Sequence, residues 1–158
     1  MSNICMCKEC LTVFNKDKLN EETCPMVGCY GDLFEIDEEM IPFVIELRSK
    51  GYETLFCCQG HITDYKGIIQ IYIMLEGDMS DNNLSDIEKP DGFKVYNSYS
   101  INPRQNIESG GSNKREVTMI EKRIIHCTSY SDALYKLATS RVELLRWIEN
   151  LPNLRDYY

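Results

Sequence analysis

Long apolar runs are missing from this chain. No stretch approaches the roughly 20 consecutive apolar residues of a membrane-spanning helix. Residues 1–8 also lack the basic start and the apolar run of a secretory signal. These absences predict a cytoplasmic protein with no membrane partner. Cysteines stay reduced in that compartment, so the eight in this chain are expected to be metal ligands or reactive thiols rather than disulfides.

Positive charge is also scarce, because 17 Lys and Arg stand against 25 Asp and Glu, which gives a formal net charge of −8. A protein that binds nucleic acid through its phosphates needs clustered basic residues. The Lys-Arg pairs at 114–115 and 122–123 are too few and too scattered for that role. Nucleic acid is therefore not expected as a direct high-affinity partner. The acidic surface either serves solubility or docks on a basic protein.

Apolar residues make up 43% of the chain, which is enough for a packed core. Their periodicity and the turn residues between them predict an α+β protein. The expected helices are 37–50 and 131–150, and the expected strands are 52–58, 68–75, 93–101 and 117–127. Asp37 is the expected N-cap of the first helix, Gly51 is expected to end it, and the β-branched run 68–75 is typical of a central strand. The apolar stripe of the second helix is expected to be Leu134, Leu137, Ala138, Leu144, Leu145 and Ile148, with Trp147 as a packing residue. Loops at 76–92 and 102–115 are expected to be mobile.

Five of the eight cysteines lie before residue 30, and four of them form two pairs. Cys7 and Cys10 are separated by two residues, whereas Cys24 and Cys29 are separated by four. A tight turn aims each pair of thiolates at one point, and two such turns complete the tetrahedron that Zn²⁺ accepts. So short a segment has too few apolar residues to fold without its metal. We therefore predict one structural Zn²⁺ held by these four cysteines.

The residues around the pairs resemble the zinc ribbon family. Phe14 lies four positions after Cys10, Pro25 follows Cys24 directly, and Gly31-Asp32-Leu33 follows the second pair. The resemblance implies a zinc ribbon at the N-terminus of the chain. The second spacing departs from the two residues that are usual in the family, so the second knuckle must bulge.

The zinc ribbon is expected to occupy residues 1–36. Residues 37–158 would then form the α+β domain, with a small antiparallel or mixed sheet flanked by two helices. Cys5 is a fifth thiol in the ribbon segment. It either replaces Cys7 as a ligand or fills the strand position before the first knuckle.

A second group of reactive side chains follows the first expected strand of the α+β domain. Cys57 and Cys58 end that strand, and His61 lies three residues beyond it. Neighbouring residues of a strand point to opposite faces, so Cys58 is the candidate to share a site with His61. His126 and Cys127 would join this site if the two strands were neighbours.

Three interpretations of Cys58 and His61 stay open at this point. They are a buried structural cysteine with a hydrogen-bonded histidine, a second metal or ligand-binding site, and a Cys/His nucleophile pair. The segment from Gly51 to His61 resembles a motif in small uncharacterised proteins of low-GC Gram-positive bacteria and their phages. Its order of helix, strand and turn is more distantly similar to that of the tRNA wybutosine-synthesis methyltransferases.

The first resemblance implies a bacterial or phage origin, so the leading hypothesis is a cytoplasmic zinc-binding protein of such an origin. Such a protein would act by binding a protein or a small ligand, and a phage protein that interferes with a host system is one version of this function. The alternative is an enzyme with Cys58 and His61 as its candidate catalytic residues. The second resemblance implies that this enzyme would be methyltransferase-like.

Overall fold

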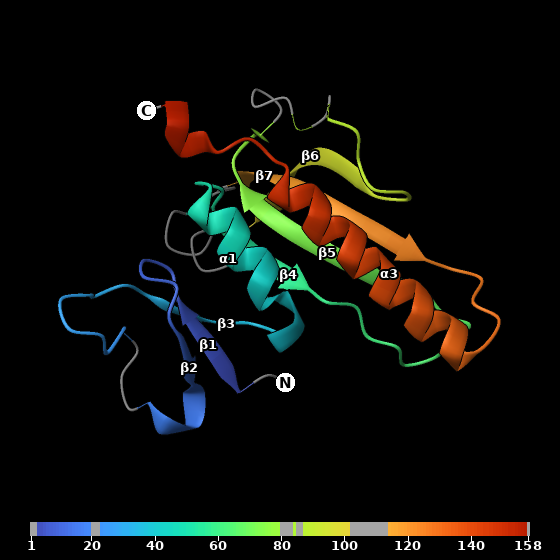
Figure 1. Ribbon diagram of the computed structural model, residues 1–158, viewed down its shortest axis with the longest axis horizontal. Coiled ribbons are helices and arrows are strands. Elements are labelled where there is room, and N and C mark those ends of the chain that lie inside the picture. Colours follow the sequence, from blue (N-terminus) through green and yellow to red (C-terminus); the bar gives the residue numbers. More distant parts are fainter. Residues whose placement is uncertain (1–2, 20–22, 80–83, 85–86, 102–113, 158) are drawn as a thin grey trace.

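The computed structural model describes residues 3–19, 23–79, 84, 87–101 and 114–157. These residues form an α+β protein, as the sequence predicts, with two antiparallel sheets and the helices α1 and α3 (Figure 1). The elements in chain order are β1 (Ile4–Cys7), β2 (Val13–Asn15), η1 (Lys16–Lys18), β3 (Leu33–Glu35), η2 (Glu38–Met40), α1 (Ile41–Ser49), β4 (Thr54–Cys58), β5 (Ile69–Glu76), β6 (Lys94–Ile101), β7 (Lys114–Ile124), α3 (Tyr130–Glu149) and η4 (Leu154–Tyr157). Within this part of the chain, no helix has both the length and the apolar character needed to cross a bilayer.

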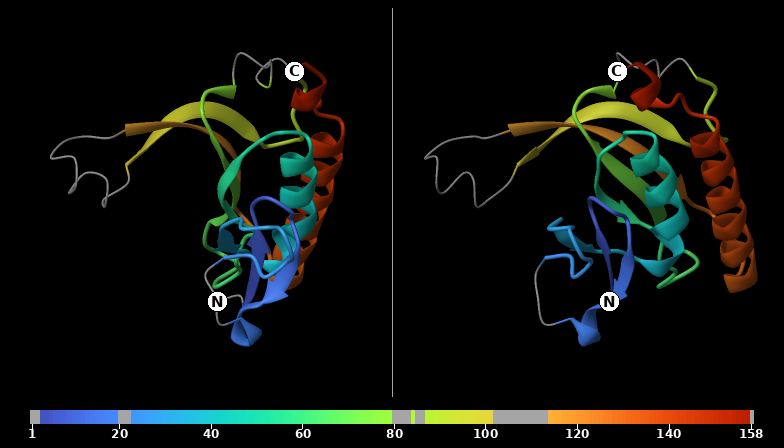
Figure 2. Two further views of the ribbon diagram at one scale, coloured as in Figure 1. Left: turned by 90° about the vertical axis from the view of Figure 1, so that its left-hand side faces the viewer. Right: turned by 60° about the vertical axis from the view of Figure 1, so that its left-hand side comes forward.

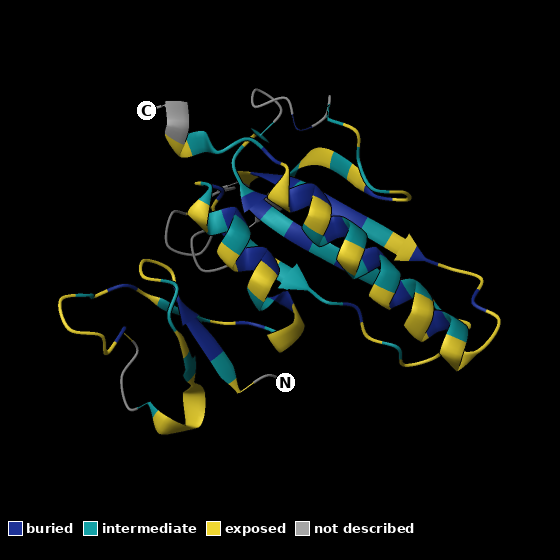
Figure 3. Ribbon diagram, viewed as in Figure 1, coloured by how far each residue is buried: buried dark blue, intermediate teal, exposed yellow. Residues whose placement is uncertain are grey.

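The larger sheet has the strand order β4-β5-β7-β6, and every neighbouring pair is antiparallel. Helices α1 and α3 cover one face of it (Figure 2). Alternate residues of β5 are buried in the core that these elements share, namely Ile69, Ile71, Ile73 and Leu75 (Figure 3). The intervening residues of β5 are only half-buried, because no helix covers the opposite face. The order leaves β4 and β6 as the two edge strands.

Helix α1 ends where the sequence predicts, at a glycine. Gly51 has φ +94°, a conformation that glycine adopts without a steric cost. The N–H of Tyr52 donates to the carbonyl oxygen of Leu47, which closes a Schellman motif. The chain leaves the helix sharply at this point and enters β4, the strand that carries Cys57 and Cys58.

The smaller sheet, with the order β2-β1-β3, belongs to the ribbon module, which we define as the described part of residues 3–36. Met6 and Ile36 are fully or almost fully buried in the same hydrophobic cluster as Leu47 of α1. The core therefore continues across the expected boundary between residues 36 and 37. Two further contacts join the module to the rest of the protein, because the Arg48 guanidinium lies 5.1 Å from the centre of the Phe34 ring and donates to the carbonyl oxygen of Lys8.

The apolar stripe of α3 differs from the expected one. Leu134 is 47% exposed and Ala138 is also exposed, so both predictions were wrong. The buried residues are Ala133, Leu137, Ser140, Leu144, Trp147 and Ile148. The spacing of a 3.6-residue helix runs through Ala133 and Ser140, two small residues that an analysis based on large side chains overlooks. The prediction that Trp147 packs in the core is confirmed.

The strand expected at 117–127 is displaced toward the N-terminus, because β7 begins at Lys114 and ends at Ile124. Most of the loop expected at 102–115 lies outside the described residues, as does part of the loop at 76–92. Within the described part of the loop at 76–92, Leu84 is fully buried. The Oγ1 atom of Thr118 also anchors the start of that loop, since it donates to the carbonyl oxygen of Gly77 at 2.9 Å.

Candidate metal centre

The four predicted zinc ligands converge in the ribbon module. The Sγ atoms of Cys7 and Cys29 are 3.7 Å apart and those of Cys10 and Cys24 are 3.6 Å apart. All four sulfur atoms lie within 4.8 Å of one another. A tetrahedral site with Zn–S bonds of about 2.3 Å separates its sulfur atoms by about 3.8 Å. The four thiols therefore fit a zinc ion, and they make this the metal centre that the sequence predicts.

Two tight turns position the four sulfur atoms. In the first knuckle, the N–H of Leu11 donates to the carbonyl oxygen of Cys7, and Leu11 itself has φ +62°. In the second knuckle, the N–H of Cys29 donates to the carbonyl oxygen of Met26, and Gly28 has φ +78°. The two extra residues of the second spacing are absorbed in this wider turn, as the expected bulge requires.

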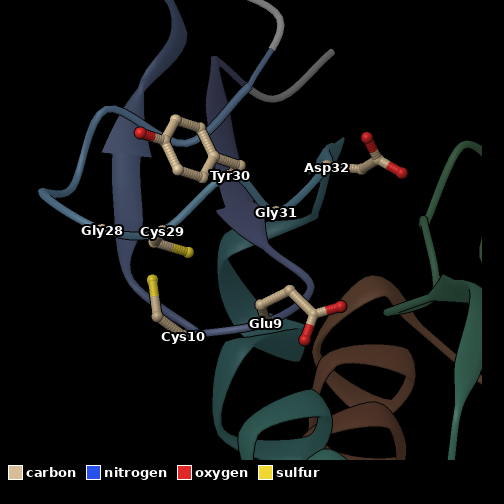
Figure 4. A pocket seen from close by; sticks show the side chains of 7 residues that line it. All are labelled: Glu9, Cys10, Gly28, Cys29, Tyr30, Gly31 and Asp32. Atoms are coloured by element: carbon tan, nitrogen blue, oxygen red, sulfur yellow. The ribbon is translucent and has the colours of Figure 1, made fainter.

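Gly31 lies against the metal centre and leaves no room for a side chain. A Cβ atom on Gly31 would stand 2.6 Å from the Sγ atom of Cys7. The carbonyl oxygen of Gly31 also accepts from the N–H of Cys24, so the glycine fixes the backbone of one ligand while it contacts the sulfur of another. Figure 4 shows the sulfur atoms of Cys10 and Cys29 turned toward each other beside this glycine.

Two of these thiols, those of Cys10 and Cys24, have pKa values shifted in opposite directions. Hydrogen bonding with Thr12 lowers the pKa of Cys10 to about 6, whereas burial raises the pKa of Cys24 to about 12. Zinc binds thiolates, so its binding displaces protons from the cluster. A zinc ion here would supply structural cohesion, because four protein ligands close its coordination shell.

The fifth thiol of the module stays out of the cluster. Cys5 is buried on β1, and its Sγ atom lies 3.8 Å from the carbonyl oxygen of Phe14. Burial raises the pKa of the Cys5 thiol. Of the two roles left open by the sequence, the structure favours the strand position over replacement of Cys7.

Of the second candidate group, the structure brings Cys58 and His61 together. One ligand atom from each of Cys58 and His61 lies within 4.8 Å of the other, and Asp37 joins them within the same distance. Cys57 points into the core instead, and its burial raises the pKa of the Cys57 thiol to about 12. Cys58, rather than Cys57, is therefore the cysteine that lies near His61.

The pair at 126–127 does not join this group. Strand β5 lies between β4 and β7, so the two strands are not neighbours and the condition for His126 and Cys127 to join the site is not met. His126 is exposed and has φ +58°, whereas Cys127 is buried in the hydrophobic core.

Sequence reasoning missed Asp37 as a member of this group. Its position before a helix gave it the simpler role of an N-cap. It does occupy the N-cap position of η2, but its side chain makes no capping hydrogen bond. Its contacts with Cys58 and His61 join positions 21 and 24 residues apart, which local sequence patterns do not display.

Comparison of the chain with protein-family profiles, with curated proteins and with solved structures yields no match. The interpretation of the four-cysteine cluster and of the group at Cys58 and His61 therefore rests on their geometry and chemistry. The four-cysteine cluster could hold a metal ion, and its ligand set favours zinc.

Proposed function

We propose that this chain is a small zinc-binding protein that binds an extended segment of a protein partner in the groove between β3 and β4. The proposal rests on the outer edge of β4, which pairs with no other strand in the described part of the chain. Strand order places β4 at the edge of the larger sheet and β3 at the edge of the smaller one. A groove of about 390 Å³ lies between them, lined by residues 34–37 and 54–57.

Backbone chemistry favours an extended chain as the occupant. A strand at a sheet edge presents N–H and C=O groups to which another strand can pair, and peptide-binding domains use such edges. Four residues of β4 line the groove, which is room for about four residues of partner at 3.4 Å each.

Apolar side chains flank this edge and give the groove its selectivity. Phe34, Ile36 and Leu55 line it together with Phe56, whose side chain is 63% exposed. A large aromatic ring left in water beside an open strand edge is a common mark of a binding surface. Side chains of the partner that point to either side of its strand would contact these residues.

Charge defines the two ends of the groove. Arg48 closes one end, where its Nη2 atom donates to the carbonyl oxygen of Thr54 at 2.6 Å. Asp37 lies at the other end, near Cys58, whereas the carboxylate of Glu35 is paired with Lys16. The net charge of the whole chain, −8, also favours a basic partner. We therefore propose a partner segment that is apolar in its centre and carries a basic residue near Asp37.

The proposal is tested with a library of random displayed peptides, selected on the zinc-loaded protein. Selected peptides are expected to share an apolar stretch with a neighbouring Lys or Arg, and to shift the amide resonances of residues 54–58. Phe56→Ser should weaken their binding by about tenfold or more, since truncated aromatic anchors at the centre of an interface cost about 2 kcal/mol. Tyr135→Ser is the matched control, because Tyr135 is 72% exposed on α3.

Selected peptides that bind equally well to the Phe56→Ser variant, or that shift resonances only elsewhere, would overturn the proposal. A small molecule that fills the groove while no peptide binds would point to the small-ligand version of the function instead. An origin in a bacterium or its phage, a cytoplasmic location and interference with a host system remain part of the proposal on the sequence resemblance alone.

An enzyme that uses Cys58 and His61, methyltransferase-like or otherwise, is the second candidate. The observation that favours it is the approach of the thiol to the imidazole within 4.8 Å. A nucleophilic thiol would be alkylated quickly at neutral pH, and Cys58→Ser would then remove an activity without unfolding the protein.

A further inference from the structure

Three side chains of different chemistry meet at the open end of β4, outside the ribbon module's metal centre. Asp37, Cys58 and His61 each offer one ligand atom, and these atoms lie within 4.8 Å of one another. The Nε2 atom of His61 is 3.8 Å from the Oδ2 atom of Asp37. The side chains of His61 and Asp37 are 61% and 27% exposed, so a dissolved ion has access to the group.

The carboxylate of Asp37 does not cap the helix that follows it. As the N-cap of η2 it makes no side-chain capping hydrogen bond. Gln59 supplies a bond at that helix end instead, since its Oε1 atom accepts from the N–H of Glu39 at 3.3 Å. The residue that takes over the capping lies between Cys58 and His61, so the same contact holds their loop against Asp37.

The loop between Cys58 and His61 is also fixed from its other side. Arg141 of α3 donates through Nε to the carbonyl oxygen of Gln59 at 3.0 Å, and through Nη2 to that of Gly60 at 3.4 Å. Gly60 has φ +89°, and a Cβ atom there would stand 2.6 Å from Cδ1 of Leu137. Packing and hydrogen bonds from α3 therefore preorganise the loop, as the support around a metal site does.

We propose that Asp37, Cys58 and His61 bind a second divalent metal ion of the zinc class. Thiolate, imidazole and carboxylate are the three donor types that zinc accepts, and a site with three protein ligands leaves a fourth position for water or another ligand. Tetrahedral bonds of about 2.0 to 2.3 Å separate the ligand atoms by about 3.3 to 3.6 Å. The ligand atoms lie within 4.8 Å of one another, so their separations exceed this by about 1.5 Å at most, and the exposed His61 side chain is free to move toward the other two.

The open fourth position distinguishes this ion from the one in the ribbon module. There, four cysteines close the coordination shell, whereas here a solvent molecule completes it. Asp37 also lines the groove between β3 and β4, so the second ion would lie at the acidic end of that groove. The metal proposal does not need a peptide in the groove, and a bound ion would compete with a basic residue of the partner for Asp37.

The test uses full-length protein that carries one Zn²⁺, confirmed by native mass spectrometry, and titrates it with Co²⁺. The two metals differ in mass, so the spectrum separates an added Co²⁺ from one that has replaced zinc. We expect one added Co²⁺ per chain, together with the charge-transfer absorption of a cobalt–thiolate bond. The variants Asp37→Asn, Cys58→Ser and His61→Ala should each weaken Co²⁺ binding by about tenfold or more.

His126→Ala is the control, because His126 is the other histidine of the chain and lies outside the cluster. It should bind Co²⁺ as the unchanged protein does. The His61→Ala variant removes an exposed side chain and should retain its fold and its zinc, which circular dichroism and the mass spectrum verify. Absence of added Co²⁺, Co²⁺ found only in place of zinc, or thiolate absorption that persists in Cys58→Ser would each overturn the proposal.

Discussion

The side-chain ammonium of Lys50 donates a 2.8 Å hydrogen bond to the carbonyl oxygen of Ile148, 98 positions later in the chain. It also donates to the carbonyl oxygen of Leu151 at 3.0 Å. Lys50 is the C-cap of α1, and these carbonyl groups lie at and just beyond the end of α3, where that of Ile148 also accepts from the N–H of Leu151 at 3.1 Å. One cation at the end of α1 thereby satisfies the end of α3 and complements its dipole.

Replacement of Lys50 by Met should therefore destabilise the protein. The side chain is only 12% exposed, so its loss removes a charged donor from a partly buried set of carbonyl groups. Hydrogen bonds to charged groups contribute about 2 kcal/mol, which corresponds to a fall in Tm of about 4–8 °C for a domain of this size. Thermal unfolding followed by circular dichroism measures the change. Lys18→Met, at an exposed position, should leave Tm within about a degree.

Gly31→Ala should weaken zinc binding by about tenfold or more, because the new methyl group would displace the sulfur of Cys7. Competition with a chromophoric chelator measures the affinity. Val27→Ala is the control in the same knuckle, since Val27 is fully exposed. Equal zinc affinities for the two variants would show that the contact between Gly31 and Cys7 has no part in the site.

The carboxyl groups of Glu53 and Glu76 should make the stability of the protein depend on pH. A hydrogen bond with Glu53 raises the pKa of Glu76, with burial as the next cause. A group whose pKa is raised on folding stabilises the fold below its unfolded pKa, and this contribution is lost as pH rises through the folded pKa. Glu53→Gln removes the like charge, so the variant should gain Tm relative to the unchanged protein as pH rises.

The expected gain is about 1–2 °C at pH 7.5 and about zero at pH 4.5, since solvent screens this mostly exposed pair. Scanning calorimetry at both pH values measures the difference. Glu116→Gln is the control, because Glu116 is exposed on β7. A gain that is the same at both pH values would assign the effect of Glu53→Gln to packing rather than to charge.

Local signals made much of the fold predictable. Cysteine spacing identified the four ligands, Gly51 identified the end of α1, and the β-branched run around Ile71 identified the central strand. Each of these features depends on chemistry within a few residues, which a sequence displays directly.

Features that depend on strand order were not predictable in the same way. Nothing near His126 reveals that β5 separates its strand from β4. Asp37 and His61 meet only because Gln59 and Arg141 hold the intervening loop, and both contacts join residues 20 or more positions apart. Small residues in the inner stripe of α3, such as Ala133, were hidden because periodicity is judged from large side chains.

The central claim is that Cys7, Cys10, Cys24 and Cys29 hold one structural zinc ion, and X-ray absorption at the zinc edge tests it most directly. The sample is the full chain carrying one equivalent of zinc. The account predicts a first shell of four sulfur atoms at about 2.3 Å, and the loss of one of these sulfur atoms in Cys24→Ser. Chelation of the zinc should also unfold the ribbon module, because metal binding supplies its stability. A shell that contains nitrogen or oxygen in the unchanged protein, or four sulfur atoms retained in Cys24→Ser, would contradict the account.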